Sequence, residues 1–240
     1  MAIISPEERR LGGVAAEPAE FRMRFQELLQ RAAAQANVRE EPVLGPYLTI
    51  SREAGSGGGE LARRVGDRLG WTVLDRELVH NLAKRLEIEP RLLKLMDETR
   101  VGWFSETLLN LFDSRLLLQG SYVSMLSRAM ALAAAEGRVV IVGRAGNLVL
   151  SPHGGLRVRV VAPHGLRLSA LAEREGLDER SAARRLDQLD ADREDFVRRH
   201  FHRDLSDPRN YDLVINVGGL GNERALDLLC HALRLRGLTD

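Results

Sequence analysis

The stretch from Tyr47 to Leu61, YLTISREAGSGGGEL, constrains the fold more than any other part of this chain. Its first four residues, Tyr47 to Ile50, have the length and β-branched content of a buried strand. A glycine-rich turn follows, and from Gly59 onward the apolar residues recur at helical spacing. The sequence therefore predicts a strand, a glycine loop and a helix in direct succession. Backbone N–H groups and the helix N-terminus of such a unit favour bound phosphate.

The loop departs from the P-loop pattern G-x-x-x-x-G-K-[ST], in which the Lys reaches the β- and γ-phosphates and the hydroxyl binds Mg²⁺. When Gly57 is taken as the second motif glycine, Arg52 stands at the first glycine and Gly58 stands at the Lys. Gly59 and Glu60 then follow where a hydroxyl is expected. Two interpretations remain open: a phosphate cradle without its usual cation, or a tight turn that uses glycine only for clearance.

The charge balance and the cysteine count limit the classes of partner. The 240 residues include 35 basic and 34 acidic side chains, so the net charge of +1 gives no reason to propose nucleic acid or a membrane surface as a partner. Cys230 is the only cysteine, which excludes an internal disulfide and a Cys-based zinc site. Together with the lack of a signal peptide or a long apolar span, this predicts a cytoplasmic protein.

Residues 1–45 are predicted to form an N-terminal extension with one helix, from Ala19 to Ala36. Phe21, Phe25 and other apolar residues of this segment recur at helical spacing. Their stripe is narrow, so the helix needs a partner surface. Packing on the parent domain and contact with another subunit are both open, and the second interpretation predicts a homo-oligomer.

Four further apolar runs predict strands: Trp71 to Leu74, Val139 to Val142, Val158 to Ala162, and Leu213 to Val217. Five strands separated by helical patterns indicate an α/β domain over residues 46–240, with a mainly parallel sheet and helices on both faces. Residues 77–137 contain helical patterns and no convincing strand. This segment is far longer than a crossover connection requires, so we expect an inserted helical subdomain.

Polar residues follow the predicted strands where ligands collect in doubly wound sheets. Asp75 follows the second strand, although it can also cap the next helix. Arg144 follows the third strand, where its guanidinium can bind a phosphate or carboxylate or can form an ion pair that supports the loop. A later helix, begun by Asp178, mixes arginines with acids that would hold them in place for a polyphosphate, although such helices are often merely solvated.

With these residues assembled, the chain resembles the cytidylate kinase-like family, a divergent relative of bacterial CMP kinases among the P-loop nucleoside monophosphate kinases. The resemblance covers about Leu48 to Leu235. It rests on motifs that occur in order: ISREAGSGGGELA, LDRELV, VVIVGRAGN, AEREGL, DxDRxxFxRR and DPRNYDLVIN. It implies a five-stranded parallel sheet, a helical monophosphate-binding insertion at 77–137, and an arginine-bearing lid at about 178–208.

The resemblance also implies roles for individual residues. The donor phosphates would bind Gly55, Ser56, Gly57, Gly58, Gly59 and Glu60. The acceptor would bind Asp75 and Arg144. The expected catalytic residues are Arg52, Asp75, Arg193, Arg198 and Arg199. That Arg52 stands in part for the missing Lys is our own interpretation and is not implied by the resemblance. No residue would ligate a metal directly, since Mg²⁺ would enter with ATP, and Ser56 or Asp75 would contact its water shell.

The expected reaction is transfer of the ATP γ-phosphoryl group, with Mg²⁺, to a pyrimidine nucleoside monophosphate such as CMP or dCMP. The alternative is a nucleotide-binding or regulatory protein that keeps the fold but lacks turnover. Its motivation is the missing Lys, because a lost phosphate cation weakens transition-state stabilisation. The candidates for reading the base, Asn81, Arg100 and Ser124, have no diagnostic spacing.

Overall fold

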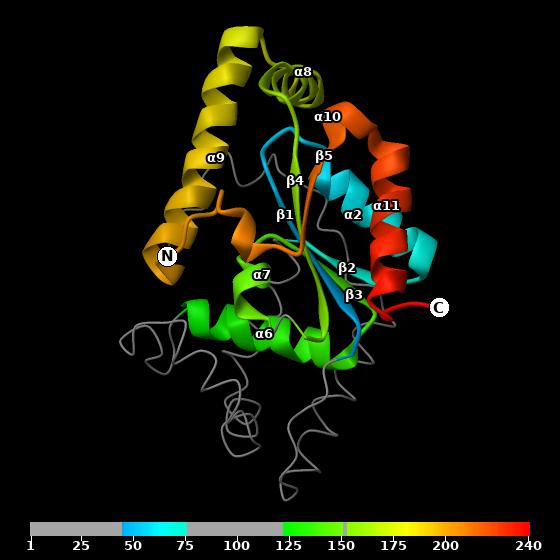
Figure 1. The fold of residues 1–240 in the computed structure, drawn as a ribbon. Coiled ribbons are helices and arrows are strands. Elements are labelled where there is room, and N and C mark those ends of the chain that lie inside the picture. The colour runs from blue at the N-terminus through cyan, green and yellow to red at the C-terminus, as the bar shows by residue number, and fades with distance from the viewer. Residues whose placement is uncertain (1–44, 76–121, 151–152) are drawn as a thin grey trace, which may run out of the picture.

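Five parallel strands form one sheet in the part of the chain that the structure describes, a computed structural model covering residues 45–75, 122–150 and 153–240 (Figure 1). The spatial order is β2–β3–β1–β4–β5, and every neighbouring pair is parallel. The bounds are Tyr47–Arg52 for β1, Thr72–Leu74 for β2, Val139–Val142 for β3, Gly155–Val161 for β4 and Leu213–Asn216 for β5. The predicted five-stranded sheet is confirmed. The predicted N-terminal helix, Asn81 and Arg100 lie outside the described residues.

Two helices, α2 (Gly58–Leu69) and α11 (Asn222–Leu235), cover one face of the sheet (Figure 1). Side chains alternate along a strand, so Leu48 and Ile50 of β1 point to the same side. Both are buried in a cluster that includes Leu61 of α2 and Leu229 of α11. This alternation also directs Arg52, two residues beyond Ile50, toward the N-terminus of α2.

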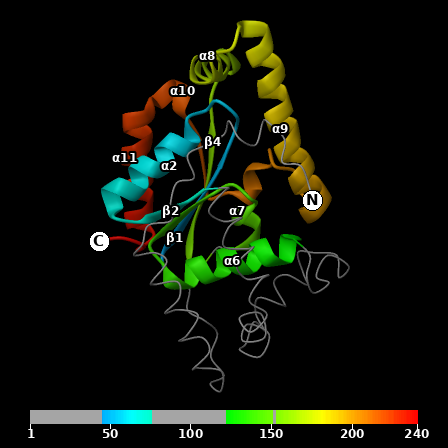
Figure 2. The ribbon, with the colours of Figure 1, turned by 180° about the vertical axis from the view of Figure 1, so that it is seen from behind.

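The opposite face is covered by α6 (Tyr122–Glu136) and α7 (Gly146–Val149), which Figure 2 shows from behind. Gly146 allows α7 to approach the sheet closely, because a Cβ there would lie 3.2 Å from Cγ2 of Ile141 in β3. Within α6, Leu126 and Met130 are buried, as their spacing predicted. This last part of the predicted insertion therefore packs against the sheet.

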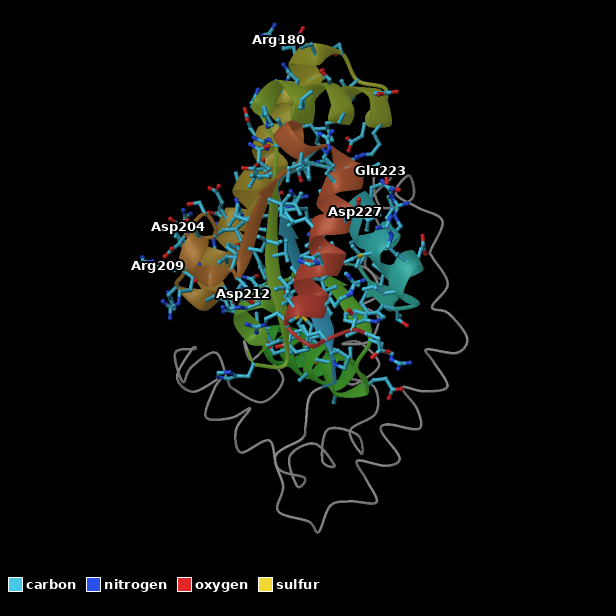
Figure 3. The ribbon with its side chains drawn as sticks, turned by 45° about the vertical axis from the view of Figure 1, so that its right-hand side comes forward. Arg180, Asp204, Arg209, Asp212, Glu223 and Asp227 are labelled. Atoms are coloured by element: carbon cyan, nitrogen blue, oxygen red, sulfur yellow. The ribbon has the colours of Figure 1, made fainter. Side chains whose placement is uncertain are left out.

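A helical hairpin of α8 (His164–Glu175) and α9 (Glu179–Phe201) follows β4. Gly176 ends α8 in the left-handed conformation, with φ of +65°. Asp178 begins α9 by accepting a hydrogen bond from the Ser181 N–H at 2.9 Å, as the sequence predicted for a cap. Arg180 lies at the far tip of this hairpin, away from the sheet (Figure 3).

Most of the predicted lid is α9, one continuous helix. Leu171 of α8 and Leu186 of α9 form a small buried cluster with Ala54, which follows β1. The hairpin is therefore docked against the start of the glycine loop. Two short elements, η1 (Pro208–Asn210) and α10 (Val217–Leu220), flank β5.

Strand ends differ from the sequence expectation by a few residues. We expected the first strand to end at Ile50, but Ser51 and Arg52 continue the pairing with β4. We expected the last strand to reach Val217, but it ends at Asn216. The Asn216 side chain accepts a hydrogen bond from the Gly218 N–H at 3.0 Å and so caps the start of α10. In both cases a neighbouring element sets the boundary, and an apolar run alone does not contain that information.

Candidate functional site

The loop between β1 and α2 has the conformation that the glycines predict. Gly55 and Gly57 have φ of +71° and +76°, in the region that side chains disfavour. A Cβ on Gly55 would also lie 2.2 Å from the Arg167 carbonyl oxygen of α8. The Ser56 hydroxyl is buried and donates to the Glu53 carbonyl at 2.9 Å, so it serves the loop itself. The loop thus leads directly into the N-terminus of α2, where partial positive charge gathers.

Asp190 of α9 joins this loop to the helical hairpin. Its carboxylate accepts the Ala54 N–H at 2.7 Å. It also accepts hydrogen bonds from the guanidinium groups of Arg167, at 2.5 Å, and Arg193, at 3.1 Å. Arg167 in turn lies 3.4 Å from the carboxylate of Glu53. Because these side chains are mostly shielded from water, the network fixes the first limb of the loop against α8 and α9.

Two cavities open beside the loop. The first, named here the loop cavity, measures about 830 Å³ and is lined by the glycine loop, one side of α2 as far as Gly70, β2 and part of α8. The second, the β3 cavity, measures about 470 Å³ and lies between the segment after β3 and one face of α9. Arg52 and Arg193 line both cavities. Arg193 also donates to the Arg52 carbonyl at 3.3 Å, which keeps the two arginines together.

The loop cavity contains both signs of charge. Its lining includes Arg52, Glu53, Glu60, Arg63, Asp67, Asp75, Arg174 and Arg193. Glu60 and Arg63, one turn apart on α2, form an exposed ion pair at 2.5 Å. Asp75, directly after β2, lines this cavity and not the β3 cavity, whereas Arg144 lines the β3 cavity. Asp75 is therefore placed beside the loop on which we expected the donor.

The β3 cavity begins with an unusual turn. Gly143, Arg144 and Ala145 have φ of +79°, +52° and +57°, three successive left-handed residues. Residues with side chains adopt this conformation at a cost, so contacts around the turn must maintain it. The Arg144 guanidinium lies over the Phe196 ring of α9, 5.7 Å from its centroid. A cation and an aromatic surface therefore face this cavity together.

Two further groups set the charge around the β3 cavity. His200 lies beside Phe196, with 5.0 Å between ring centroids, and burial together with nearby Arg199 holds the pKa of the imidazole below its ordinary value. Arg159 of β4 is buried and donates a hydrogen bond to the Tyr211 hydroxyl at 3.5 Å. The Tyr211 hydroxyl in turn forms a hydrogen bond with the hydroxyl of Ser51 at 3.3 Å, and Ser51 lines the cavity. Arg159 adds positive potential behind this wall.

The three predicted lid arginines differ in position. Arg193 lies where the cavities meet, and Arg199 lines the β3 cavity while pairing with Asp195 at 2.8 Å. Arg198 also pairs with Asp195, but it lines neither cavity. The structure therefore brings two of the three to the site.

Sequence reasoning missed several residues of the site. Asp190 and Arg193 are one turn apart in the DxDR motif, and that spacing could have indicated their ion pair. Nothing local identifies Arg167, whose contacts with the loop span 113 residues of chain. Phe196 is part of the DxDRxxFxRR motif, but its contact with Arg144 depends on the tertiary fold.

Comparison with known proteins identifies the family. A model of the cytidylate kinase-like family matches residues 47–218. The chain belongs to this family. A crystal structure of an uncharacterized protein from Eubacterium ventriosum shares the fold, with a TM-score of 0.56 and 22% identity over 78% of this chain and 98% of that one. The family match supports a nucleotide kinase-like fold, and the likeness to the crystal structure shows the α/β fold alone.

One curated protein, uronate isomerase from Corynebacterium glutamicum, is 35% identical over 91 residues. The match covers 38% of this chain and only 18% of that relative, too little for the isomerase activity to be transferred. Among the residues that the structure describes, no helix is long and apolar enough to cross a membrane. The same residues contain no group of three or more side chains arranged to hold a metal ion.

Proposed function

We propose that this protein transfers the γ-phosphoryl group of ATP to a pyrimidine nucleoside monophosphate. The observation that carries the proposal is the meeting of two cavities at Arg52 and Arg193. Phosphoryl transfer needs two phosphates held in line and cations to take up charge in the transition state. The loop cavity would hold the triphosphate and the β3 cavity the monophosphate, with the two arginines between them.

The β3 cavity has features that suit a monophosphate. Its volume of about 470 Å³ lies within the range of small-ligand sites. Arg144 and Arg199 supply charge for a phosphate, while Asn147 and Asp192 supply polar atoms for a base or ribose. The choice of a pyrimidine, CMP or dCMP, rests on the family and not on a contact in this cavity.

The groups that line the loop cavity are of the kinds that bind Mg²⁺–ATP. The left-handed glycines and the N-terminus of α2 favour the phosphates. Glu60 and Asp75, two of the carboxylates that line this cavity, would face the water shell of Mg²⁺, whereas the Ser56 hydroxyl is bonded within the loop. The ion would neutralise charge on the donor phosphates.

A second candidate function is nucleotide binding without turnover. It is favoured by Gly58, where the structure leaves no room for the Lys of the P-loop pattern. A Cβ at this position would lie 2.6 Å from the Cβ of Arg52. Without another cation at the same place, the loop would bind phosphate but stabilise the transition state poorly.

An ATP-consumption assay with a panel of nucleoside monophosphates separates the two functions. For the kinase, Arg144→Ala should lower kcat/KM for the acceptor by about 30- to 900-fold, which corresponds to about 2 to 4 kcal/mol. Binding of ATP should be unchanged, because Arg144 does not line the loop cavity.

Arg180→Ala is the matched control, since it removes an arginine at the far tip of the hairpin that lines neither cavity, and it should leave kcat/KM unchanged. Nucleotide binding with no turnover on any acceptor would favour the second function. Normal acceptor kinetics in Arg144→Ala would instead assign Arg144 to support of its turn.

A further inference from the structure

The stem of Arg52 passes directly over the first residue of α2. Arg52 ends β1 on the face that α2 covers. A Cβ built on Gly58 would lie 2.6 Å from the Cβ of Arg52 and 3.2 Å from its Cγ. These atoms are close to the backbone and cannot move aside as the end of a long side chain can. The Arg52 stem therefore occupies the place from which a side chain at position 58 would begin.

The head of Arg52 is accommodated by a second glycine. A Cβ on Gly143 would lie 2.2 Å from Nη1 of Arg52 and 3.3 Å from its Cζ. Gly143 directly follows β3, and its φ of +79° also favours glycine. The guanidinium thus lies between the ends of β1 and β3, where the loop cavity meets the β3 cavity.

The two positions are related through the P-loop pattern. The pattern has glycine where this chain has Arg52, and Lys where this chain has Gly58. The cation and the glycine have exchanged places across the loop. We infer that Arg52 is the phosphate-binding cation of this loop and reaches a bound triphosphate from β1, as the Lys would from the helix. Its assignment to a triphosphate rests on the proposed function.

The chemistry of arginine supports this role. A guanidinium presents a planar fork of donors that can bind two phosphate oxygens at once, and it stays charged at any pH the protein tolerates. The Arg52 side chain is partly exposed and lines both cavities, so its head is within reach of a ligand in either. The hydrogen bond from Arg193 to the Arg52 carbonyl holds a second cation at the same junction.

Isothermal titration calorimetry of the full chain with inorganic tripolyphosphate tests the inference without an acceptor. Arg52→Gly should lower the affinity by about 30-fold or more, since a charged hydrogen-bond partner is lost. Gly58→Lys alone should also bind weakly, because the new side chain meets Arg52. The double variant Arg52→Gly, Gly58→Lys restores the usual P-loop order and should recover affinity to within about tenfold of the original chain.

The geometry supports recovery in the double variant. Once the Arg52 side chain is removed, the nearest remaining atom recorded around a Cβ at position 58 is the Val160 Cβ at 3.3 Å, which needs only a small adjustment. Arg52→Gln is a second variant that keeps most of the packing while removing the charge, and it should lose affinity as Arg52→Gly does. Thermal unfolding of each variant checks that it is folded.

Arg64→Gln is the matched control, because Arg64 lies on α2, pairs with Glu223 and lines neither cavity. Its tripolyphosphate affinity should be unchanged. Unchanged affinity in folded Arg52→Gln, or loss in Arg52→Gly with no recovery in the double variant, would overturn the inference. Arg52-dependent binding with no turnover on any acceptor would remove the proposed reaction and leave the inference standing. Turnover together with tripolyphosphate binding that does not depend on Arg52 would overturn the inference and leave the proposed reaction standing.

Discussion

Two arginine–carboxylate networks in this protein have similar distances and very different surroundings. On the surface, α2 and α11 are joined by Arg64–Glu223 and Arg68–Asp227, each at 2.5 Å, with Glu223 and Asp227 facing α2 (Figure 3). At the loop, Arg167 and Asp190 are also 2.5 Å apart. Glu223 is 73% exposed, whereas Asp190 is only 24% exposed and also accepts a backbone N–H. Shielding and backbone contact, not bond length, should decide how much each network stabilises.

The largest effect should come from breaking the network at the loop. Asp190→Ala leaves the Ala54 N–H and two guanidinium groups without this acceptor. We expect the free energy of unfolding to fall by about 2 to 4 kcal/mol, measured by urea denaturation. Asp187→Ala, an exposed carboxylate on the same helix, should change it by less than about 0.5 kcal/mol. Equal effects of the two variants would mean that the loop network contributes nothing to the free energy of unfolding.

An intermediate case lies at the edge of the sheet. Arg157 and Asp212 are each 19% exposed and paired at 2.8 Å. Partial burial acts to raise the pKa of Asp212, but hydrogen bonds from the side chain and backbone of Arg157 outweigh it and hold the pKa below its ordinary value. Asp212→Asn should therefore lower the free energy of unfolding at pH 7 by about 1 to 2 kcal/mol.

The pH dependence of this pair has a definite sign. A carboxyl group whose pKa is lowered in the folded state makes its full contribution to the free energy of unfolding when the pH is above its unfolded pKa of about 3.9. That contribution is lost as the pH falls through the lower, folded value. The difference between Asp212→Asn and the original chain should therefore shrink when urea unfolding is repeated below about pH 3. A difference that stays constant with pH would show that the variant acts through packing.

The smallest effect should come from the surface network. Glu223→Gln and Asp227→Asn should each lower the free energy of unfolding by less than about 1 kcal/mol, because water and ions screen both pairs. Repeating the measurement in about 1 M salt should remove most of the difference. A larger, salt-independent loss would make this network equivalent to the one at the loop.

The sequence predicted the fold well because short-range patterns determine much of it. Val139 to Val142 is a strand over the whole predicted range, since four successive apolar residues fit a strand buried on both faces. Glycine conformations in the loop also followed from local chemistry. Strand ends at Arg52 and Asn216 could not be predicted in the same way, because pairing with β4 and the start of α10 set them.

The candidate site was predictable only where its residues are close in sequence. The exchange of Arg52 and Gly58 is visible in the motif, but the space for the guanidinium depends on Gly143 after another strand. The hydrogen bond between Ala54 and Asp190 joins residues 136 positions apart. Such contacts follow from how β4 and the α8–α9 hairpin are placed, and no periodicity in the sequence encodes that placement.

In the left-handed turn after β3, the residue that would favour folding stability at position 144 differs from the residue that would favour phosphate binding. A residue with a side chain adopts this backbone at a cost of about 1 to 2 kcal/mol, whereas glycine adopts it freely. Glycine would relieve the strain at Arg144 and remove the guanidinium from the β3 cavity in the same step. Selection for stability alone would therefore favour replacing this arginine. A lineage that no longer needed the charge would fold better without it.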